Sequence, residues 1–194
     1  HGVRAVAERA GWRRNVAAAP VAAALAWLAL LGGRGGGWNG YTVDARPERA
    51  LHAAVAALPR DALVAGWPRG VLDNVPFVAR RSVLLDWESH EVLCTGYADE
   101  MRRRMAALTA AYYVTDPAAR DRLRDEWGVT HLLLDRTHFG PEPPVYFEPF
   151  NRAVREAHAA WRGAREAGAW DRTDRAIVYR DDTHVMIDLR RSAP

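Results

Sequence analysis

A chain of 194 residues has room for one domain of ordinary size and a short additional segment. Its 27 basic side chains are all arginines, set against 24 acidic ones. The net excess of +3 lies in residues 1–15, which hold four Arg and one Glu, whereas the rest of the chain is balanced. A nucleic-acid-binding domain carries its basic excess on the folded body, so we expect no nucleic-acid partner.

Cys94 is the only cysteine, which excludes an intrachain disulfide and a cysteine-based metal cluster. It follows Val92 and Leu93, and a cysteine in apolar surroundings is typically a small buried side chain rather than a reactive thiol. The glycines at 32–37 form no dinucleotide- or phosphate-binding motif. These patterns predict no cofactor and no metal.

Residues 16–31 contain no charged side chain, and arginines crowd their entrance. Extended to Gly33, the run makes a helix of roughly 17 residues and about 26 Å, the short end of what spans a bilayer. A buried helix of this length normally shows a polar face, and residues 32–35 are a poor signal-peptide cleavage site. The pattern therefore favours a transmembrane helix over residues 16–33. Because the chain begins with His1 rather than Met, we expect the run to be internal to a longer protein.

The arginines around this run predict its orientation. Positive charge accumulates on the cytoplasmic side of a membrane, and the exit of the run carries only Arg34 before Arg46. We predict, in chain order, a cytoplasmic flank over 1–15, the transmembrane helix over 16–33, a linker over 34–45 and an extracytoplasmic domain over 46–194. The expected localisation is the cell membrane, and the expected partners are the lipid bilayer and an upstream membrane part of the same protein.

Hydrophobic periodicity, capping residues and turn residues predict the elements of the soluble part. They are, in chain order, a helix over 46–58, a buried strand over 62–66, a loop containing residues 73–76, a strand over 82–86, a helix over 97–113, a helix from Asp116 and Pro117 to Gly128, a buried strand over 129–135, a helix over 150–167, and a closing hairpin of strands 177–179 and 185–187. Strands that alternate with helices predict an α/β fold, a three-layer sandwich with a mostly parallel sheet and a C-terminal hairpin.

Polar side chains gather where the predicted strands end, and ligands of open parallel sheets bind beyond the carboxyl ends of the strands. The candidates for binding a polar ligand such as a sugar or a phosphate are Arg69, Asp73, Asn74, Asp86, Glu88, Asp135 and His138. The alternative is that Asp86 and Asp135 cap neighbouring backbone and that Glu88 pairs with an arginine. A metal site of His90, His138 and a carboxylate is less favoured, because no tight ligand motif supports it. No catalytic residue emerges from the sequence.

Several segments together carry a family resemblance. They are residues 58–68 (Leu-Pro-Arg-Asp-Ala-Leu-Val-Ala-Gly-Trp-Pro), 73–76 (Asp-Asn-Val-Pro), 80–84 (Arg-Arg-Ser-Val-Leu), 112–113 (Tyr-Tyr) and 127–134 (Trp-Gly-Val-Thr-His-Leu-Leu-Leu). Over about residues 15–190, the chain resembles the C-terminal soluble domain of polytopic bacterial membrane proteins similar to GT-C-type glycosyltransferases, which use lipid-linked sugars.

The resemblance implies a domain that packs over the membrane part and helps to bind a lipid-linked sugar or a glycan acceptor. In that family the catalytic acidic residue lies in an early extracytoplasmic loop, upstream of this segment, so the resemblance transfers no catalytic residue. Our first hypothesis is therefore an accessory domain of a glycosyltransferase-like membrane protein. The alternatives are a membrane-anchored binding or assembly domain without enzymatic activity, and a soluble secreted α/β enzyme.

Overall fold

The computed structural model describes residues 20, 23–27, 45–87, 95–113, 118–146, 148–164 and 176–191. The chain divides into two compact units, His1–Asp44 and Ala45–Pro194. In the first unit, Pro20 and residues 23–27 are helical, and the side chains of Leu25 and Trp27 are exposed. The predicted flank over 1–15, most of the predicted transmembrane helix and nearly all of the predicted linker lie outside the described residues. Within the described ranges, no helix is both long enough and apolar enough to cross a membrane.

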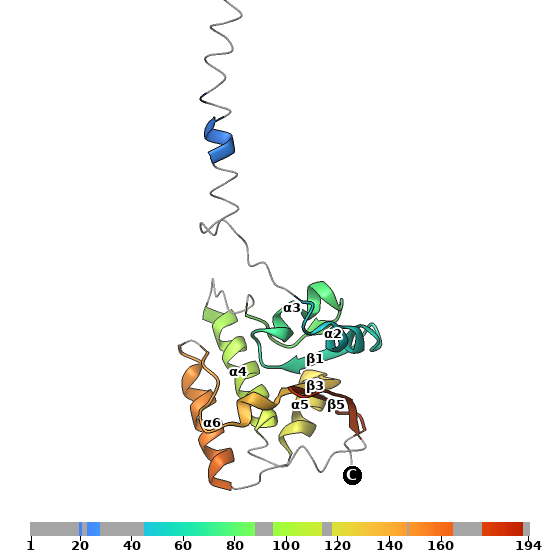
Figure 1. The fold of residues 1–194 in the computed structure, drawn as a ribbon. Coiled ribbons are helices and arrows are strands. Elements are labelled where there is room, and N and C mark those ends of the chain that lie inside the picture. Colours follow the sequence, from blue (N-terminus) through green and yellow to red (C-terminus); the bar gives the residue numbers. More distant parts are fainter. Residues whose placement is uncertain are drawn as a thin grey trace, which may run out of the picture. The chain divides into compact units, whose positions relative to one another are not determined.

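The second unit is an α/β domain built on a mixed five-stranded sheet (Figure 1). Its strands are β1 (Leu63–Gly66), β2 (Ser82–Val83), β3 (His131–Asp135), β4 (Ile177–Arg180) and β5 (His184–Asp188), in the spatial order β2-β1-β3-β5-β4. The pairings of β1 with β2 and of β1 with β3 are parallel, whereas β5 runs antiparallel to both β3 and β4.

The prediction of a mostly parallel sheet is therefore only half right. The predicted hairpin forms, as β4 and β5, but it joins the sheet beside β3 and contributes two antiparallel pairings to the four. The predicted strand over 82–86 is also shorter than expected, since the ladder covers Ser82 and Val83 only.

Among the described residues of this unit, five α-helices and one short 3₁₀ helix accompany the strands. They are α2 (Arg49–Ala56), α3 (Val71–Val78), α4 (Thr95–Tyr112), α5 (Ala119–Trp127), the 3₁₀ helix η2 (Arg136–Phe139) and α6 (Asn151–Ala164). Helices α2, α4, α5 and α6 confirm the four helices that were predicted from the sequence. Helices α3 and η2 were not predicted. As predicted, α5 ends at Gly128, which adopts the left-handed conformation at φ 69° that glycine tolerates best. The predicted cap at Asp116 and Pro117 lies outside the described residues.

Helix α3 occupies the segment that was expected to be a loop. The expectation failed because Asp73, Asn74 and Pro76 are typical turn residues. Leu72 and Val75, three residues apart, are buried on one side of the helix, and their burial against the sheet outweighs the weak local propensity. Pro76 lies in the second half of this two-turn helix, so it removes at most one backbone hydrogen bond.

Helices cover both faces of the sheet (Figure 1). Successive strand residues point to opposite faces, and the core divides accordingly. Val64, Leu133 and Met186 pack with α2 and α3. Their chain neighbours Ala65, Leu132, Leu134, Val185 and Ile187 pack with α4, α5 and α6. The sheet is thus buried on both sides, as near-continuous apolar strands require.

Candidate ligand-binding site

The strand order contains a topological switch point between β1 and β3. From β1 the chain passes through α3 to β2 on one side, and β3 lies on the other side of β1. Connections that leave in opposite directions open the sheet at its carboxyl edge, which is where α/β proteins bind ligands. Trp67 follows β1 and His138 follows β3, and their ring centroids are 5.1 Å apart. The carboxyl ends of these two strands therefore meet, as the sequence predicted.

Three aromatic rings connect this point with the end of β2. The ring of Tyr146 lies 5.5 Å from that of Trp67 and 5.3 Å from that of Trp87, each in an edge-to-face arrangement. Trp67 and Tyr146 are buried, whereas Trp87 is half-buried. Sequence reasoning missed Tyr146, which comes from the Pro-rich loop 140–149. Trp87 is therefore the ring of the three that reaches the surface, and the buried Tyr146 packs against it edge to face.

Charged side chains surround the half-buried Trp87. The guanidinium carbon of Arg69 lies 4.7 Å from the centre of the Trp87 ring, within cation–π range. The backbone N–H of Trp87 donates to Asp73 Oδ1 at 2.8 Å, which ties the end of β2 to the first turn of α3. The predicted residues Arg69 and Asp73 therefore lie together at Trp87.

The same charged side chains shift the pKa of the Tyr146 phenol. Burial raises its pKa well above the ordinary value, the carboxylates of Asp73 and Asp86 raise it further, and Arg69 lowers it. These three side chains consequently lie within electrostatic reach of one phenol, and that phenol stays protonated as a hydrogen-bond donor. We name the set Trp67, Arg69, Asp73, Asp86, Trp87 and Tyr146 the aromatic–carboxylate cluster.

Three other residues singled out in the sequence remain to be placed. The side-chain amide of Asn74 donates to the carbonyl of Gly70 at 2.9 Å, so it fastens the start of α3. Glu88 and His90 lie outside the described residues. Among those described, no group of three or more His, Cys, Asp or Glu side chains is arranged to hold a metal ion.

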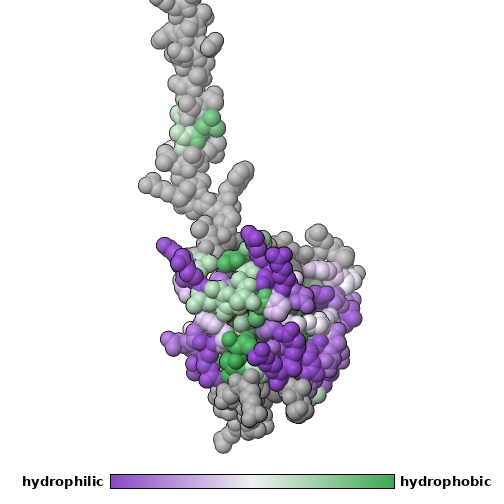
Figure 2. Space-filling model, turned by 90° about the vertical axis from the view of Figure 1, so that its right-hand side faces the viewer, coloured by the Kyte–Doolittle hydropathy of each residue, from purple (hydrophilic) through white to green (hydrophobic). Residues whose placement is uncertain are grey.

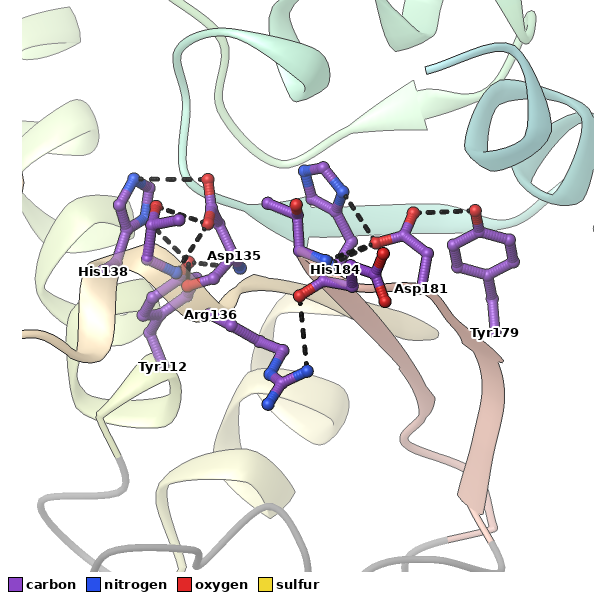
Figure 3. Close-up of polar contacts among 10 residues, drawn as sticks. Tyr112, Asp135, Arg136, His138, Tyr179, Asp181 and His184 are labelled. Carbon is purple, nitrogen blue, oxygen red and sulfur yellow. Dashed lines mark hydrogen bonds and ion pairs between the residues drawn. The ribbon is translucent and has the colours of Figure 1, made fainter. Parts of the chain in front are cut away.

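Asp135, His138 and Tyr112 form a connected group next to Trp67 (Figure 3). The Tyr112 oxygen accepts the backbone N–H of Asp135 at 2.8 Å and lies 3.0 Å from His138 Nδ1. The phenolic proton has two acceptors within reach, His138 Nδ1 at 3.0 Å and the Asp135 carbonyl at 3.5 Å, and we assign it to the shorter contact, as donation to a neutral Nδ1. His138 Nε2 then carries the ring proton, and it lies 3.6 Å from Asp135 Oδ2.

The role of Asp135 is mainly local. Its Oδ1 accepts from the backbone N–H and the hydroxyl of Thr137, at 2.8 and 2.6 Å, and so caps the 3₁₀ helix η2. The capping interpretation of this residue is thus confirmed.

Burial lowers the pKa of His138, the Asp135 carboxylate raises it, and His184 lowers it. The neutral imidazole inferred from the hydrogen bonds agrees with this net lowering.

A second polar group lies on the same edge and was not predicted. His184 begins β5 and pairs in register with Asp135, and its Nδ1 lies 3.4 Å from Asp181 Oδ1 (Figure 3). Asp181 also accepts the Tyr179 hydroxyl at 2.8 Å. Burial, the hydrogen bond to Asp181 and the charge of that carboxylate together raise the pKa of Tyr179 to about 12. Three histidines, counting His52 of α2, thus lie near this edge, since His184 acts electrostatically on the other two.

His52 is buried, and its Nδ1 has no hydrogen-bond partner among the described residues. Burial lowers its pKa, Glu48 raises it, and His184 lowers it. A buried, unpaired imidazole nitrogen is most stable in the neutral ring. His52 and His138 are thus two histidines of this edge whose pKa is lowered, in each case chiefly by burial.

Comparison with known proteins adds no assignment to this geometry. No protein family model matches the chain, and no curated protein sequence matches it.

Proposed function

We propose that the domain of residues 45–194 is a non-catalytic, extracytoplasmic carbohydrate-binding domain of a membrane protein that resembles glycosyltransferases using lipid-linked sugars. The ligand site is the aromatic–carboxylate cluster at the carboxyl edge of the sheet. Its expected ligand is a neutral saccharide, either on a lipid carrier or on a glycan acceptor. Both the resemblance of the sequence and the chemistry of this cluster support this function.

The single observation that carries the proposal is the assembly of three aromatic rings with two carboxylates and a guanidinium at the switch point. A sugar ring offers an apolar C–H face and a circle of hydroxyls. The half-buried Trp87 ring complements the face, while carboxylates accept, and guanidinium groups donate, hydrogen bonds at the hydroxyls. Each carboxylate oxygen pair accepts up to about four hydrogen bonds, so the bond from Trp87 N–H to Asp73 is compatible with a ligand.

The charge balance favours a neutral ligand over a phosphate. Within the cluster, Asp73 and Asp86 supply two negative charges against the one positive charge of Arg69. A site with a net negative charge repels an anion, whereas the affinity for an uncharged polyhydroxylated ligand does not depend on the sign of that charge. The phosphate alternative that the sequence left open is therefore the weaker one.

Binding is favoured over catalysis by the way His138 is held. One ring nitrogen faces the Tyr112 hydroxyl at 3.0 Å and the other faces the Asp135 carboxylate at 3.6 Å. A general base needs a nitrogen within reach of the substrate proton. Neither nitrogen of His138 is available as a base, because Nδ1 accepts from the Tyr112 hydroxyl and Nε2 carries the ring proton, which suits a binding surface.

Attachment to a membrane rests on the uncharged run of residues 16–31. Leu25 and Trp27 in this run are 62% and 63% exposed, and exposed apolar side chains on a helix are typically covered by lipid or protein. Carbonate extraction of membranes from cells that make the chain tests this part. Retention in the membrane pellet is expected, and release into the supernatant would overturn membrane attachment.

The carbohydrate site is tested by calorimetric titration of the full chain in a neutral detergent with neutral oligosaccharides of hexoses and of N-acetylhexosamines. We expect saturable binding to at least one of them, weakened about tenfold by Trp87→Ala, the usual effect of removing an aromatic anchor. Trp127→Ala is the matched control, because Trp127 is also half-buried beneath an arginine, Arg104 at 5.8 Å, but lies on α5.

A milder variant separates binding from folding. Arg69 is exposed, so Arg69→Gln is expected to leave the melting temperature unchanged and to weaken the saccharide affinity. Equal loss of affinity in the Trp87 and Trp127 variants, or no binding of either oligosaccharide class by the native chain, would refute the proposed site.

A further inference from the structure

The edge of the sheet opposite the candidate site carries exposed apolar side chains. Phe77 and Val78 end α3 and are 71% and 48% exposed. The C-terminal end of α2 lies beside them, because Arg81, just after α3, donates from Nε to the carbonyl of Leu58 at 2.9 Å. Ala56 and Ala57, at that end of α2, are exposed as well. Figure 2 faces the side where α2 lies in Figure 1 and shows apolar surface bordered by hydrophilic surface.

Arginines frame this apolar surface. Arg60 and Arg80 are exposed, and neither forms an ion pair within the described part of the chain. Asp61 is the acidic neighbour, but its charge acts on Arg190, whose pKa is raised first by its hydrogen bond to Asp188 and then by Asp61. We name Ala56, Ala57, Arg60, Phe77, Val78 and Arg80 the apolar–basic patch.

The backbone at Arg80 points to a role beyond folding. Arg80 has φ +53°, the left-handed region that glycine adopts more readily than a residue with a side chain. A glycine would relieve this strain and would remove no hydrogen bond or ion pair of the side chain seen within the described residues. An exposed arginine therefore stands where the backbone favours glycine, three positions after the exposed Phe77.

We propose that the apolar–basic patch docks on the surface of an anionic phospholipid bilayer. Phe77 and Val78 enter the boundary between headgroups and acyl chains, while Arg60 and Arg80 lie among the phosphates. Exposed apolar side chains together with unpaired arginines are the combination that binds such interfaces. The docking goes beyond carbohydrate binding and is independent of it, because the two surfaces lie at opposite edges of the sheet.

The charge of the patch argues for lipid rather than for a second copy of the chain. A two-fold contact through the patch would bring Arg60 and Arg80 of both copies together, and like charges at close range repel. An anionic bilayer instead neutralises them. The uncharged run of residues 16–31 in the same chain is the further reason to expect a bilayer nearby.

A depth measurement on the full chain tests the docking. Cys94, the only cysteine, is replaced by Ser, and an environment-sensitive fluorophore is attached to Val78→Cys or, as control, to Val145→Cys, which is 75% exposed in the 140–149 loop. The protein is reconstituted in vesicles of phosphatidylcholine alone or mixed with phosphatidylglycerol, and nitroxide-labelled lipids serve as quenchers. We expect quenching at position 78 in the anionic vesicles, little in the zwitterionic ones and little at position 145.

Two variants sharpen this result, with circular dichroism as the check on folding. Arg80→Gly is expected to lower the docked-to-undocked ratio about fivefold, the effect of one arginine at an anionic surface, while raising the melting temperature. Arg103→Ala, at an exposed arginine of α4, is the matched control and is expected to leave quenching unchanged. Phe77→Ser is expected to lower the ratio by about tenfold or more.

Three outcomes would overturn the docking. One is the absence of quenching at position 78, and another is equal quenching at positions 78 and 145, which would mean general closeness to the bilayer. The third is concentration-dependent shielding of the probe at 78 without lipid, which would assign the patch to a second copy of the chain. None of these outcomes bears on saccharide binding, so the two proposals fail separately.

Discussion

Replacing Tyr112 by Phe removes one oxygen from the centre of the carboxyl edge. That oxygen accepts the backbone N–H of Asp135 at 2.8 Å and donates to His138 Nδ1 at 3.0 Å, and Tyr112 is 1% exposed. Water therefore cannot replace it without opening the core. Leaving a buried donor without a partner costs about 1–3 kcal/mol, so we expect a loss of about 2 kcal/mol in the free energy of unfolding. For a domain of this size, that loss corresponds to a fall of about 4–8 °C in melting temperature.

Tyr113→Phe is the matched control, because the neighbouring phenol makes one long contact, with the His138 carbonyl at 3.4 Å. Thermal unfolding followed by circular dichroism is expected to show a clearly smaller effect for Tyr113→Phe. A second readout is the pKa of His138, followed by proton NMR. The Tyr112 hydroxyl stabilises the neutral ring by donating to it, so its removal is expected to raise the pKa of His138 towards the ordinary value of 6.5.

Two results would refute these roles of the Tyr112 hydroxyl, and each bears on a different one. Equal losses of stability for the two tyrosine variants would mean that the Tyr112 oxygen contributes nothing specific. A fall in the pKa of His138, or no change, would mean that Nδ1 does not accept the phenolic proton and that the assigned tautomer is wrong.

Further predictions concern the backbone and the pH dependence. Gly66→Ala is expected to cost about 1–3 kcal/mol in chemical denaturation, because its Cβ would lie 2.8 Å from the carbonyl oxygen of Leu133 and push β1 away from β3. Gly96→Ala, in open space on α4, is the control and is expected to stabilise slightly; a larger loss there than at Gly66 would contradict the steric cause. Gly128→Ala is expected to cost about 1 kcal/mol from its positive φ alone, and a neutral result would show that the turn relaxes. The folded pKa of His52 lies below 6.5, so the unfolded chain binds the proton first and stability falls as pH drops below 6.5; His52→Leu is expected to make the fall between about pH 7.5 and 5.5 shallower, and an unchanged slope would refute this.

The sequence predicted the central strands because a short apolar run bounded by turn residues is typical of a strand buried on both faces. β1 and β3 fall inside the predicted ranges, and Gly128 ends α5 where a glycine was expected to. The failure at α3 has a different origin. Its helical state is decided by contacts of Leu72 and Val75 with residues far along the chain, such as Leu133 and Met186, and local sequence carries no signal of such contacts.

The candidate site was partly predictable, because residues that follow parallel strands meet at one edge of the sheet. The carboxyl ends of parallel strands converge by topology, and Arg69 and Asp86, which follow strands, act on one phenol together with Asp73 of α3. Tyr146 was missed because a loop, not a strand, delivers it. His184 was missed for a geometric reason: β5 is antiparallel, so its first residue rather than its last reaches the carboxyl edge. A search restricted to strand ends overlooks every antiparallel neighbour.

The two edges of the sheet differ in chemistry in a way that a single folding requirement does not explain. The carboxyl edge presents aromatic rings, carboxylates and histidines, whereas the opposite edge presents Phe77 and Val78 between arginines. Parallel strands place their starts and their ends at opposite edges by construction, so a domain resting on lipid by one edge turns the other edge away from the membrane. If both proposals hold, the saccharide contacts the domain on its side remote from the bilayer. A glycan acceptor that extends from the membrane surface then fits this arrangement better than a sugar still held at the headgroups by its lipid carrier.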